Sequence, residues 1–535
     1  MTLAQAVKNR FDVLVAARRT EESLWDEIRN YVLPERASFT ESAANVTGTQ
    51  QQTRRWYVMD STAGRAAEVG ASNIFHHLAN PANPWFDLSV GDGSQDKDTA
   101  VASWRKASVK RVMDYLTLDM ETMIYGQLFA SYLDVFVFGT SVLLTEDVNG
   151  RPVVQSLCLR DTYLDEGYNG TVDSLYRRIR RTPRQILQRW PNADVTEMKT
   201  AEGKSTEEII QCIFPVSDQY LAAQVPDAVK ARAKARGASH YIVYSLCSKN
   251  LVLEAGYAVE QPFAVSRWYV TSESVYGRAA GATNLPDIRL ANQATGTYLR
   301  QQAKLADPPM LLQYGQMITP LRLFPGAISY SDMPIEPNFL IPPGGSRIEF
   351  SEGLIERKQR DIQRGFFTPL FLDVDGAVKT ATQVLAETDD RNRAIAPMLI
   401  RLQQEQMRPF LRRVIGIMLR SQMIPRPPID GEVRILFNAP IVGSQRVTEA
   451  LNTMRLFEGL AAWGQIDQSA FDHADVDAVI PILREGFGAP PEVLLRGTAM
   501  QAKRRERQDA QQQMINQERA IAGAEAQAKL MAARR

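Results

Sequence analysis

The chain has 535 residues, of which 44% are hydrophobic, so it is too long for one ordinary domain and can build more than one core. Its 62 Lys and Arg residues nearly balance 61 Asp and Glu residues, for a formal net charge of +1. This balance excludes a protein that binds nucleic acid through an overall basic surface, and leaves only local basic stripes for such contacts.

Cysteine content and hydropathy bear on the cellular compartment. The three cysteines, Cys158, Cys212 and Cys247, are widely spaced and odd in number, which indicates neither a disulfide framework nor a paired metal site and suits a reducing cytoplasm. No apolar run approaches the roughly 20 residues that span a bilayer, and the N-terminal residues lack the apolar core of a secretory signal. We therefore expect no membrane residence.

The N-terminal part shows mainly helical spacing of its apolar side chains. Residues 3–33 predict one amphipathic helix or two, which Pro34 ends. Helical spacing resumes near Tyr57 and is broken by the prolines of PANPWFDLSV, after which two further helices are expected between 98 and 138. We therefore expect this part of the chain to form helices around one short buried edge, the segment PANPWFDLSV.

The pattern changes to strands at Thr140. Runs such as SVLLTED, PVVQSLCL and SLYRRIRR are separated by Asn149-Gly150 and Asn169-Gly170, and Asn-Gly between such runs is a strong signal for a β-hairpin. More strands are expected around EEIIQCIF, HYIVYSLC, LVLEA and FAVSRWYV. Residues from about 140 to 270 therefore predict a β-rich α+β domain.

One helix is predicted from 285 to 306, with Asn284 as its capping residue and Pro308-Pro309 after its end. Apolar and basic positions fall on two different sides of this helix. The first side has Ile288, Ala291, Thr295, Tyr298 and Leu305, and the second has Arg289, Gln293, Gly296, Arg300 and Lys304. The spacing is compatible with a solvated basic face and with a surface that lies near phosphates.

Proline and glycine set the boundaries in the C-terminal half. Residues 307–346 are crowded with both and predict a small strand-and-turn excursion, and a shorter helix is expected from 351 to 365. A very long helical pattern then runs from Thr380 to Met423, with kinks or breaks expected at Pro397 and Pro409. One strand, further helices and a tail rich in Gln, Ala and Arg follow.

The stretch FFTPLFLDVDGAVKTATQV, residues 366–384, contains a possible catalytic motif. An apolar run that ends in Asp-x-Asp-Gly resembles the nucleophile loop of haloacid-dehalogenase-type phosphatases, in which Asp373 would attack phosphorus and Asp375 would handle the proton in a magnesium-dependent reaction. The alternative is an exposed turn between two helices. Ala377 replaces the usual Thr, and Asp389-Asp390 lies in a helical pattern where that family has an acidic pair at a strand end. These departures favour the turn.

Other signatures of catalysis or of a cofactor site are absent from the sequence. It has no Gly-x-x-x-x-Gly-Lys phosphate loop and no Gly-x-Ser-x-Gly nucleophile elbow. His76-His77 is the only histidine pair, and adjacent helical residues point in different directions, which disfavours a shared zinc ion. We therefore predict no catalytic residue, no metal site and no cofactor.

Five stretches occur in an order that is far more specific than one Asp-x-Asp-Gly. They are ASNIFHHLANPANPWFDLSV, DVFVFGTSVLL, SVYGRAAGATNLPDIRLANQ with ADPPMLL, KTATQVLAETDDRNRAIAPMLIRLQQEQMRPFLRRVIGIMLR, and FNAPIVGSQR. Together they resemble the portal proteins, or head-to-tail connectors, of short-tailed T7-like bacteriophages. The similarity spans roughly 57 to 460, and the N-terminal helix and the terminal tail are less diagnostic.

The resemblance implies an α+β, mainly α, portal-type subunit with wing, stem, clip and crown, which assembles into a ring, usually of twelve subunits. The division that it implies is a wing at 1–284, a first stem helix at 285–306, a clip at 307–346, a second stem helix at 347–365, a channel (tunnel) loop at 366–379, a long kinked wing helix at 380–424, a crown-side strand and helices at 425–498, and a C-terminal helical tail or barrel at 499–535.

What the resemblance implies for function is a structural conduit and not an enzyme. The ring would lie at one vertex of the capsid, and double-stranded DNA would be packaged and later ejected through it without sequence-specific contacts. Implied partners are other copies of the chain, the terminase large subunit, tail adaptor or tail tube proteins, and the major capsid and scaffolding proteins. The implied location is the virion, after assembly in the host cytoplasm and without a membrane.

The same resemblance places candidate DNA-facing residues in two segments. They are Arg289, Arg300 and Lys304 of the first stem helix, and Asp373, Asp375 and Lys379 of the channel loop. Phosphate contacts carry no sequence information, so basic residues at these positions would guide a duplex without reading its bases.

Two further expectations concern the surroundings of these residues. The basic face of 285–306 could instead be a seam between subunits, paired with the acidic side chains Glu352, Glu356 and Asp361. The base of the channel loop is expected to be anchored by Phe366, Phe367 and Phe371.

Overall fold

The structure, a computed structural model, divides the chain into two compact units, Met1–Ala439 and Pro440–Arg535. The residues that it describes are 2–36, 38–39, 58–91, 98–118, 123–191, 193, 207–271, 274–306, 310–311, 338–339, 345–368, 395–429, 431–437, 449–460, 475–486, 500–510, 512–514 and 516. The backbone alone is described at 99, 304–306, 310–311, 338–339, 345–351, 476–477 and 485–486.

The described residues before Thr140 are mainly helical, as the spacing of their apolar side chains predicts. The helices are α1 (Leu3–Val32), α3 (Thr62–Leu78), α4 (Thr99–Leu118) and α5 (Ile124–Phe138). α1 is a single helix that begins at a capping box, in which the Thr2 hydroxyl accepts a hydrogen bond from the Gln5 N–H and the Gln5 side chain accepts one from the Thr2 N–H. The helices expected at 3–33 and within 98–138 are therefore confirmed.

A two-stranded antiparallel sheet joins distant parts of the chain. β1 (Phe86–Val90) pairs with β12 (Val433–Phe437), and Phe86 lies opposite Phe437. The Trp104 indole of α4 donates a hydrogen bond to the carbonyl of Pro425, which fixes the segment that leads to β12 (2.8 Å). The sequence predicts a buried edge and a strand at these places but not their pairing, because partners so far apart leave no local pattern.

A three-stranded sheet in the order β3-β2-β9 follows α5. It consists of β2 (Thr140–Val148), β3 (Arg151–Leu157) and β9 (Phe263–Arg267), all antiparallel. Between β2 and β3, Asn149 and Gly150 both have positive φ values of 53° and 80°, which is the geometry of the tight hairpin turn that Asn-Gly favours. The hairpin predicted at this position is confirmed.

A five-stranded antiparallel sheet in the order β4-β5-β6-β7-β8 forms the other part of the β-rich region. Its strands are β4 (Thr162–Glu166), β5 (Val172–Arg181), β6 (Glu207–Pro215), β7 (His240–Leu246) and β8 (Leu251–Ala258). Short helices accompany it: η2 (Leu159–Asp161), α6 (Pro183–Arg189), α7 (Gln219–Ala222) and α8 (Asp227–Ala235). The strands and hairpins predicted between 140 and 270 are confirmed.

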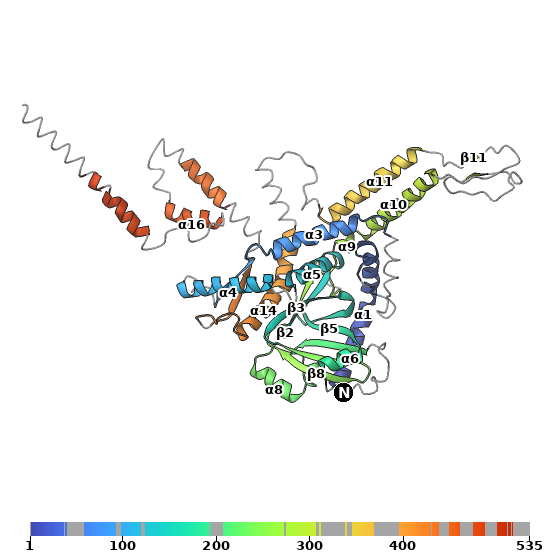
Figure 1. Ribbon diagram of the computed structural model, residues 1–535, viewed down its shortest axis with the longest axis horizontal. Helices are drawn as coiled ribbons and strands as arrows, with labels where there is room; N and C mark the ends of the chain where they lie inside the picture. The colour runs from blue at the N-terminus through green and yellow to red at the C-terminus, as the bar shows by residue number, and fades with distance from the viewer. Residues whose placement is uncertain are drawn as a thin grey trace, which may run out of the picture. The chain divides into compact units, whose positions relative to one another are not determined.

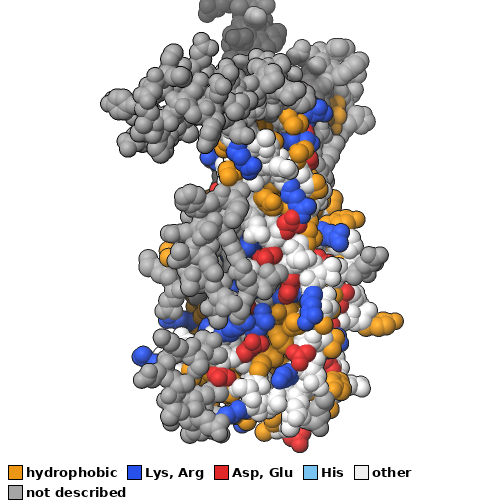
Figure 2. Space-filling model, turned by 90° about the vertical axis from the view of Figure 1, so that its right-hand side faces the viewer, with side chains coloured by type: hydrophobic (Ala, Val, Ile, Leu, Met, Phe, Trp, Pro, Cys, Tyr) orange, Lys and Arg blue, Asp and Glu red, His pale blue; other side chains and the backbone are white. Residues whose placement is uncertain are grey.

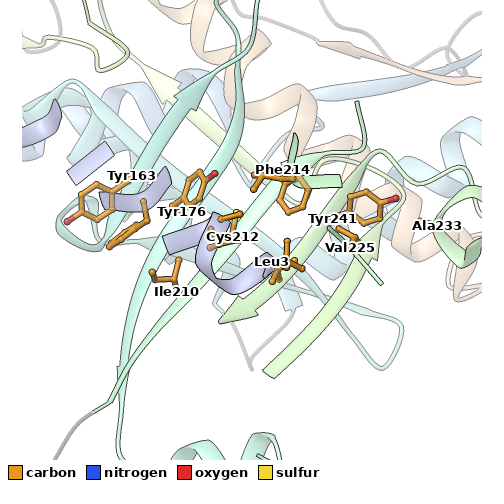
Figure 3. Packing of buried hydrophobic residues seen from close by; sticks show 14 residues of the cluster. Leu3, Tyr163, Tyr176, Ile210, Cys212, Phe214, Val225, Ala233 and Tyr241 are labelled. Atoms are coloured by element: carbon orange, nitrogen blue, oxygen red, sulfur yellow. The ribbon is translucent and has the colours of Figure 1, made fainter. Parts of the chain in front are cut away.

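The five-stranded sheet is covered on both faces. α1 packs on one face, where Phe11 meets the Tyr163 ring edge to face at 4.8 Å. Tyr163, Cys212 and Phe214 belong to the buried cluster on this face, which Figure 3 shows. α6 packs on the opposite face through Ile186. Because successive side chains of a strand point to opposite faces, this burial of both faces explains the nearly continuous apolar run in β6.

The helices α10 (Leu285–Ala306) and α11 (Gly345–Gly365) lie side by side, and α9 (Ala280–Thr283) leads into the first of them (Figure 1). Asn284 caps α10 only through its backbone carbonyl, which accepts from the Ile288 N–H (3.0 Å). Its side-chain amide instead donates to the Ala280 carbonyl (2.8 Å), so the expected side-chain cap is not formed. Gly365 explains this orientation, because a Cβ at that position would overlap the Asn284 side chain.

One face assignment within α10 is wrong. Ile288 and Ala291 are buried as predicted, but Gly296, which the spacing puts on the basic side, is buried as well. Met59 covers it, with Met59 Cγ 3.6 Å from the position of a Cβ at Gly296, and the Met59 N–H donates to the Asn292 side chain (2.6 Å). A segment far away in the sequence covers this turn, and helical spacing alone cannot reveal that.

The described part of the long helical pattern runs from 395 to 420 and changes its pitch. A π-helical turn, η4 (Gln403–Met407), directly precedes α14 (Arg408–Arg420). Pro409 lies at the start of α14, lacks an N–H and crowds the preceding turn, which a wider turn accommodates. The irregularity predicted at Pro409 is confirmed. Pro397 lies in helical backbone, and the residues directly before 395 are outside the described residues.

In the second unit the described residues are helical. The helices are 449–460, α16 (Val476–Gly486) and 500–510. Helices predicted between 445 and 496 are thus present where that span is described, and part of the Gln/Ala/Arg tail is helical. Over both units the fold is a mainly helical mixture of helices and sheets, as predicted.

A buried histidine makes the five-stranded sheet sensitive to acid. His240, at the start of β7, is 7% exposed, and burial lowers its pKa to about 4. The unfolded chain binds the proton already near pH 6.5, so stability is lost as the pH falls from about 6.5 to 4. Between pH 7 and pH 4.5, we expect the free energy of unfolding of His240→Gln to fall by roughly 2–3 kcal/mol less than that of the unmutated protein. Urea denaturation at these two pH values measures the difference.

The control for this prediction is His76→Gln, which changes an exposed histidine of α3 and should keep the acid sensitivity of the unmutated protein. Asp134 acts in the opposite direction over the same range, since burial raises its pKa to about 6, but it is common to all three proteins. Equal acid sensitivity of His240→Gln and the unmutated protein would contradict the prediction.

Candidate functional site

The helices α10 and α11 carry the first group of residues that the sequence analysis singles out. Apolar side chains close their contact, since Ile288 of α10 and Ile362 of α11 are almost fully buried. The Lys358 ammonium donates across the contact to Asp287 Oδ1 (2.8 Å) and along its own helix to Asp361 Oδ2 (3.3 Å). These hydrogen bonds, that to Asp287 first, raise the pKa of Lys358, so the side chain stays charged and links the two helices.

Arg289 is engaged within the subunit. Its guanidinium forms an ion pair with Glu27 of α1, and the two side chains are 47% and 35% exposed. An exposed pair of this kind contributes roughly 0–1 kcal/mol to stability. The pair also neutralises the local charge, so Arg289 attracts a nearby phosphate less than an unpaired arginine would.

Besides Arg289, four arginines with described side chains on these helices are exposed, and one of them, Arg360, pairs with Glu356. Arg300 of α10 and Arg357 and Arg364 of α11 form no ion pair with any residue in the described part of the chain. Among the residues that Figure 2 colours by type, basic and acidic side chains are interspersed. These helices therefore offer scattered cations to an anionic partner and not a continuous basic surface.

The acidic residues of α11 are among the residues expected from the sequence, but its arginines are not. Arg357, Arg360 and Arg364 follow one another at spacings of three and four, which places them on one side of a helix and could have identified them. Arg360 pairs with Glu356 one turn away (3.0 Å), and Asp361 pairs with Lys358. Glu356 and Asp361, expected as partners across a seam, are thus already paired within one chain.

The second group of candidate residues lies outside the described residues. Asp373, Asp375 and Lys379 all belong to this group, and of Lys304 only the helical backbone is described.

The segment that leads into the proposed channel loop is anchored at its start. Phe366, directly after α11, is 0% exposed and meets the Phe136 ring of α5 edge to face at 5.9 Å. Phe366 is therefore buried, as an anchor at this position requires. Phe367 is half-buried with a positive φ of 56°, and Phe371 is outside the described residues.

A short strand pair lies between α10 and α11 in the sequence. β10 (Met310–Leu311) pairs antiparallel with β11 (Asn338–Phe339), with Met310 opposite Phe339. The chain thus leaves along α10 and returns along α11. This agrees with the strand-and-turn excursion that the sequence predicts, as far as the described residues extend.

Within the described ranges the structure contains no group of three or more His, Cys, Asp and Glu side chains that could hold a metal ion. His76 and His77 lie in the last turn of α3 with their ring centres 5.9 Å apart, and burial lowers the pKa of His77. None of the described helices has the length and hydropathy needed to cross a membrane.

Comparison with known proteins decides between the readings that the sequence leaves open. Residues 4–495 match the family described as bacteriophage head to tail connecting protein. The chain belongs to this family. The family suggested by the five ordered stretches is therefore confirmed, and the phosphatase alternative centred on Asp373 has no support.

Relatives agree with this assignment over nearly the whole chain. A probable portal protein of Bordetella phage BPP-1 is 24% identical, covering 98% of this chain and 94% of its own length. A portal protein of Salmonella phage epsilon15 is also 24% identical, covering 98% and 95%. Among solved structures, a chain from the neck of an empty gene transfer agent particle covers 84% of this chain and 96% of its own at 10% identity, with a TM-score of only 0.40.

Proposed function

We propose that the protein is one subunit of a closed ring at a single capsid vertex, through which double-stranded DNA is packaged and ejected. The observation that carries this proposal is the family match over residues 4–495, together with portal relatives that cover 98% of the chain. The ring has twelve subunits in this proposal. The subunit is structural and performs no reaction.

The helix pair supports a division of the chain into stem and clip. In this proposal α10 and α11 are the two stem helices. The segment with β10 and β11 is the clip, because it connects the end of α10 to the start of α11. The N-terminal helices with both larger sheets form the wing, and the second unit forms the crown side with a helical tail or barrel. The clip meets the terminase large subunit during packaging and the tail adaptor or tail tube afterwards.

Weak and scattered charge supports a conduit in preference to a tight DNA-binding protein. Each phosphate that a protein neutralises strengthens binding through the release of counterions, so a channel that lets DNA slide should neutralise few of them at once. Arg300, Arg357 and Arg364 guide the duplex from the stem. Arg289 attracts the duplex less, because its ion pair with Glu27 neutralises its charge. Lys304, Asp373, Asp375 and Lys379 complete the DNA-facing set in this proposal.

In this proposal each copy contacts the next through two unlike surfaces. The ring closes because the rotation that relates neighbouring copies is a whole fraction of a full turn. The basic side of α10 then lies at or near the seam with the next copy. Scaffolding and major capsid proteins receive the ring during assembly in the host cytoplasm, and the finished ring remains in the virion.

Electron microscopy of the purified full-length protein tests this function. We expect closed rings with a central hole, and mass photometry should give a single species of about twelve subunits. Particles that stay monomeric under all solution conditions, including high protein concentration and the presence of scaffolding protein, would overturn the proposal.

A further inference from the structure

A small cavity lies between the two larger sheets, on the face of the five-stranded sheet that α6 covers. Its volume is about 120 Å³, and the residues that line it are Glu146, Gln155, Arg177, Ile179, Arg181, Gln185, Arg189, Trp190, Gln211 and Tyr244. Arg177, Gln211 and Tyr244 stand opposite one another on the adjacent strands β5, β6 and β7 and so form one row across the sheet. A polar row at this depth is unusual, because neighbouring positions on the same face are apolar.

Cations outnumber carboxylates in this cavity. Three arginines line it with a single carboxylate, that of Glu146, which already accepts hydrogen bonds from the Tyr244 hydroxyl (3.0 Å) and the Gln211 amide (3.4 Å). The Arg177 guanidinium donates to the Gln155 side chain (3.3 Å) and forms no ion pair with any described residue. Burial lowers the pKa of Arg177 and outweighs the attraction of Glu146. A second carboxylate, that of Glu254, lies on β8 opposite Tyr244 and accepts a hydrogen bond from the Trp190 indole (2.8 Å). Three arginines beside two carboxylates leave an excess of positive charge, part of it desolvated.

The deepest polar residue has an acceptor without a partner. Gln211 is 1% exposed, and its amide nitrogen donates to the Tyr244 hydroxyl (2.9 Å) as well as to Glu146. Turning the amide over would place its oxygen against the Glu146 carboxylate, so this orientation is fixed by charge. The Gln211 Oε1 atom is then buried with no hydrogen-bond partner among the described residues. A buried acceptor of this kind is satisfied by a donor, carried either by a water molecule or by a ligand.

We propose that this cavity binds inorganic hydrogen phosphate. The ligand accepts hydrogen bonds from Arg177, and from Arg181 and Arg189 nearer the solvent, and its remaining O–H donates to Gln211 Oε1. A phosphate monoester is mostly a dianion without that proton above its second pKa of roughly 6, and sulfate and the phosphodiesters of DNA lack it as well. The site therefore differs in chemistry from a surface that guides DNA.

The surroundings suit a small anion. Arg181, Gln185 and Arg189 are exposed and form the mouth, whereas Arg177 is half-buried and Gln211 is buried at the base. Arg189 also lies over the Tyr244 and Trp190 rings, 4.8 and 5.1 Å from their centroids, which holds the mouth in place. Because Glu146 and Gln155 come from β2 and β3, a bound ion would connect both sheets.

Calorimetric titration of the full-length protein at pH 7.5 with phosphate, sulfate and a nucleoside 5′-monophosphate tests the proposal. We expect saturable binding of one phosphate per chain, with the other two ligands at least about tenfold weaker, because they leave the buried Gln211 Oε1 atom without its hydrogen bond. Arg177→Gln should weaken phosphate binding by a similar factor or more. Arg184→Gln, an exposed arginine of α6 that does not line the cavity, should bind phosphate like the unmutated protein.

Three results would overturn the proposal: no saturable binding of phosphate, equal affinity for sulfate and phosphate, or unchanged phosphate affinity in folded Arg177→Gln. Should Arg177→Gln fail to fold, Arg181→Gln replaces it, because this side chain is exposed at the mouth. Unchanged phosphate affinity in Arg181→Gln would likewise count against the site.

Discussion

Replacing Gly139 with alanine is expected to leave little folded protein. Gly139 has a φ of +92°, which costs any other residue roughly 1–2 kcal/mol, and a Cβ there would overlap the backbone carbonyl of Gly277. The backbone cannot move aside, because the Trp268 N–H donates to the Gly139 carbonyl (2.9 Å) and the Gly277 N–H donates to Thr140 Oγ1 (2.8 Å). We expect a loss of about 4 kcal/mol or more, a large part of the 5–15 kcal/mol that stabilises a domain.

The matched control for this prediction is Gly170→Ala. Gly170 also has a positive φ, +70°, but no atom lies within 4 Å of the position of its missing Cβ. Its replacement should cost only the backbone term, roughly 1 kcal/mol. Soluble yield and the urea midpoint compare the two variants, and a Gly139→Ala protein with the stability of Gly170→Ala would show that the contact between Gly139 and Gly277 is not tight.

The location of Gly139 shows why a motif can be recognised without being explained. Phe-Gly-Thr is part of the stretch that resembles connector proteins, and its place between a helix and a strand is evident from the change of period at Thr140. The reason for glycine is a second glycine, Gly277, which approaches from the other end of the β-rich region. Local patterns predict the elements, while close approaches between distant segments depend on tertiary structure.

In the candidate site too, the sequence predicts local elements but not the contacts between distant segments. The helical period predicts α10 and part of α11, and the spacing of three and four on each helix indicates which charges share a side. It does not reveal that Glu27 of α1 reaches Arg289, or that Met59 covers Gly296. The row of Arg177, Gln211 and Tyr244 is equally hidden, because each residue belongs to a different strand whose register only the fold sets.

Removing residues 372–378 is expected to leave rings intact and to reduce the DNA retained in particles to a small fraction. Ring assembly should persist because the anchor on the N-terminal side remains: Phe366 is fully buried against Phe136, and α11 stays linked to α10 by Lys358 and Asp287. DNA retention should fall because, in the proposed function, this segment reaches the duplex in the channel. Ring images and nuclease-protected DNA per particle measure the two effects.

A length-preserving variant, Asp373→Asn with Asp375→Asn, separates the reach of the loop from its charge. Two carboxylates near DNA repel its phosphates and oppose sticking, so their loss should strengthen contact at low salt and leave little difference at high salt, where charges are screened. If the length of the loop is what matters, the Asp373→Asn, Asp375→Asn variant retains DNA and the variant without residues 372–378 does not. Normal DNA retention in the deletion variant combined with failure to form rings would overturn the channel-loop assignment, since the segment would then act in assembly.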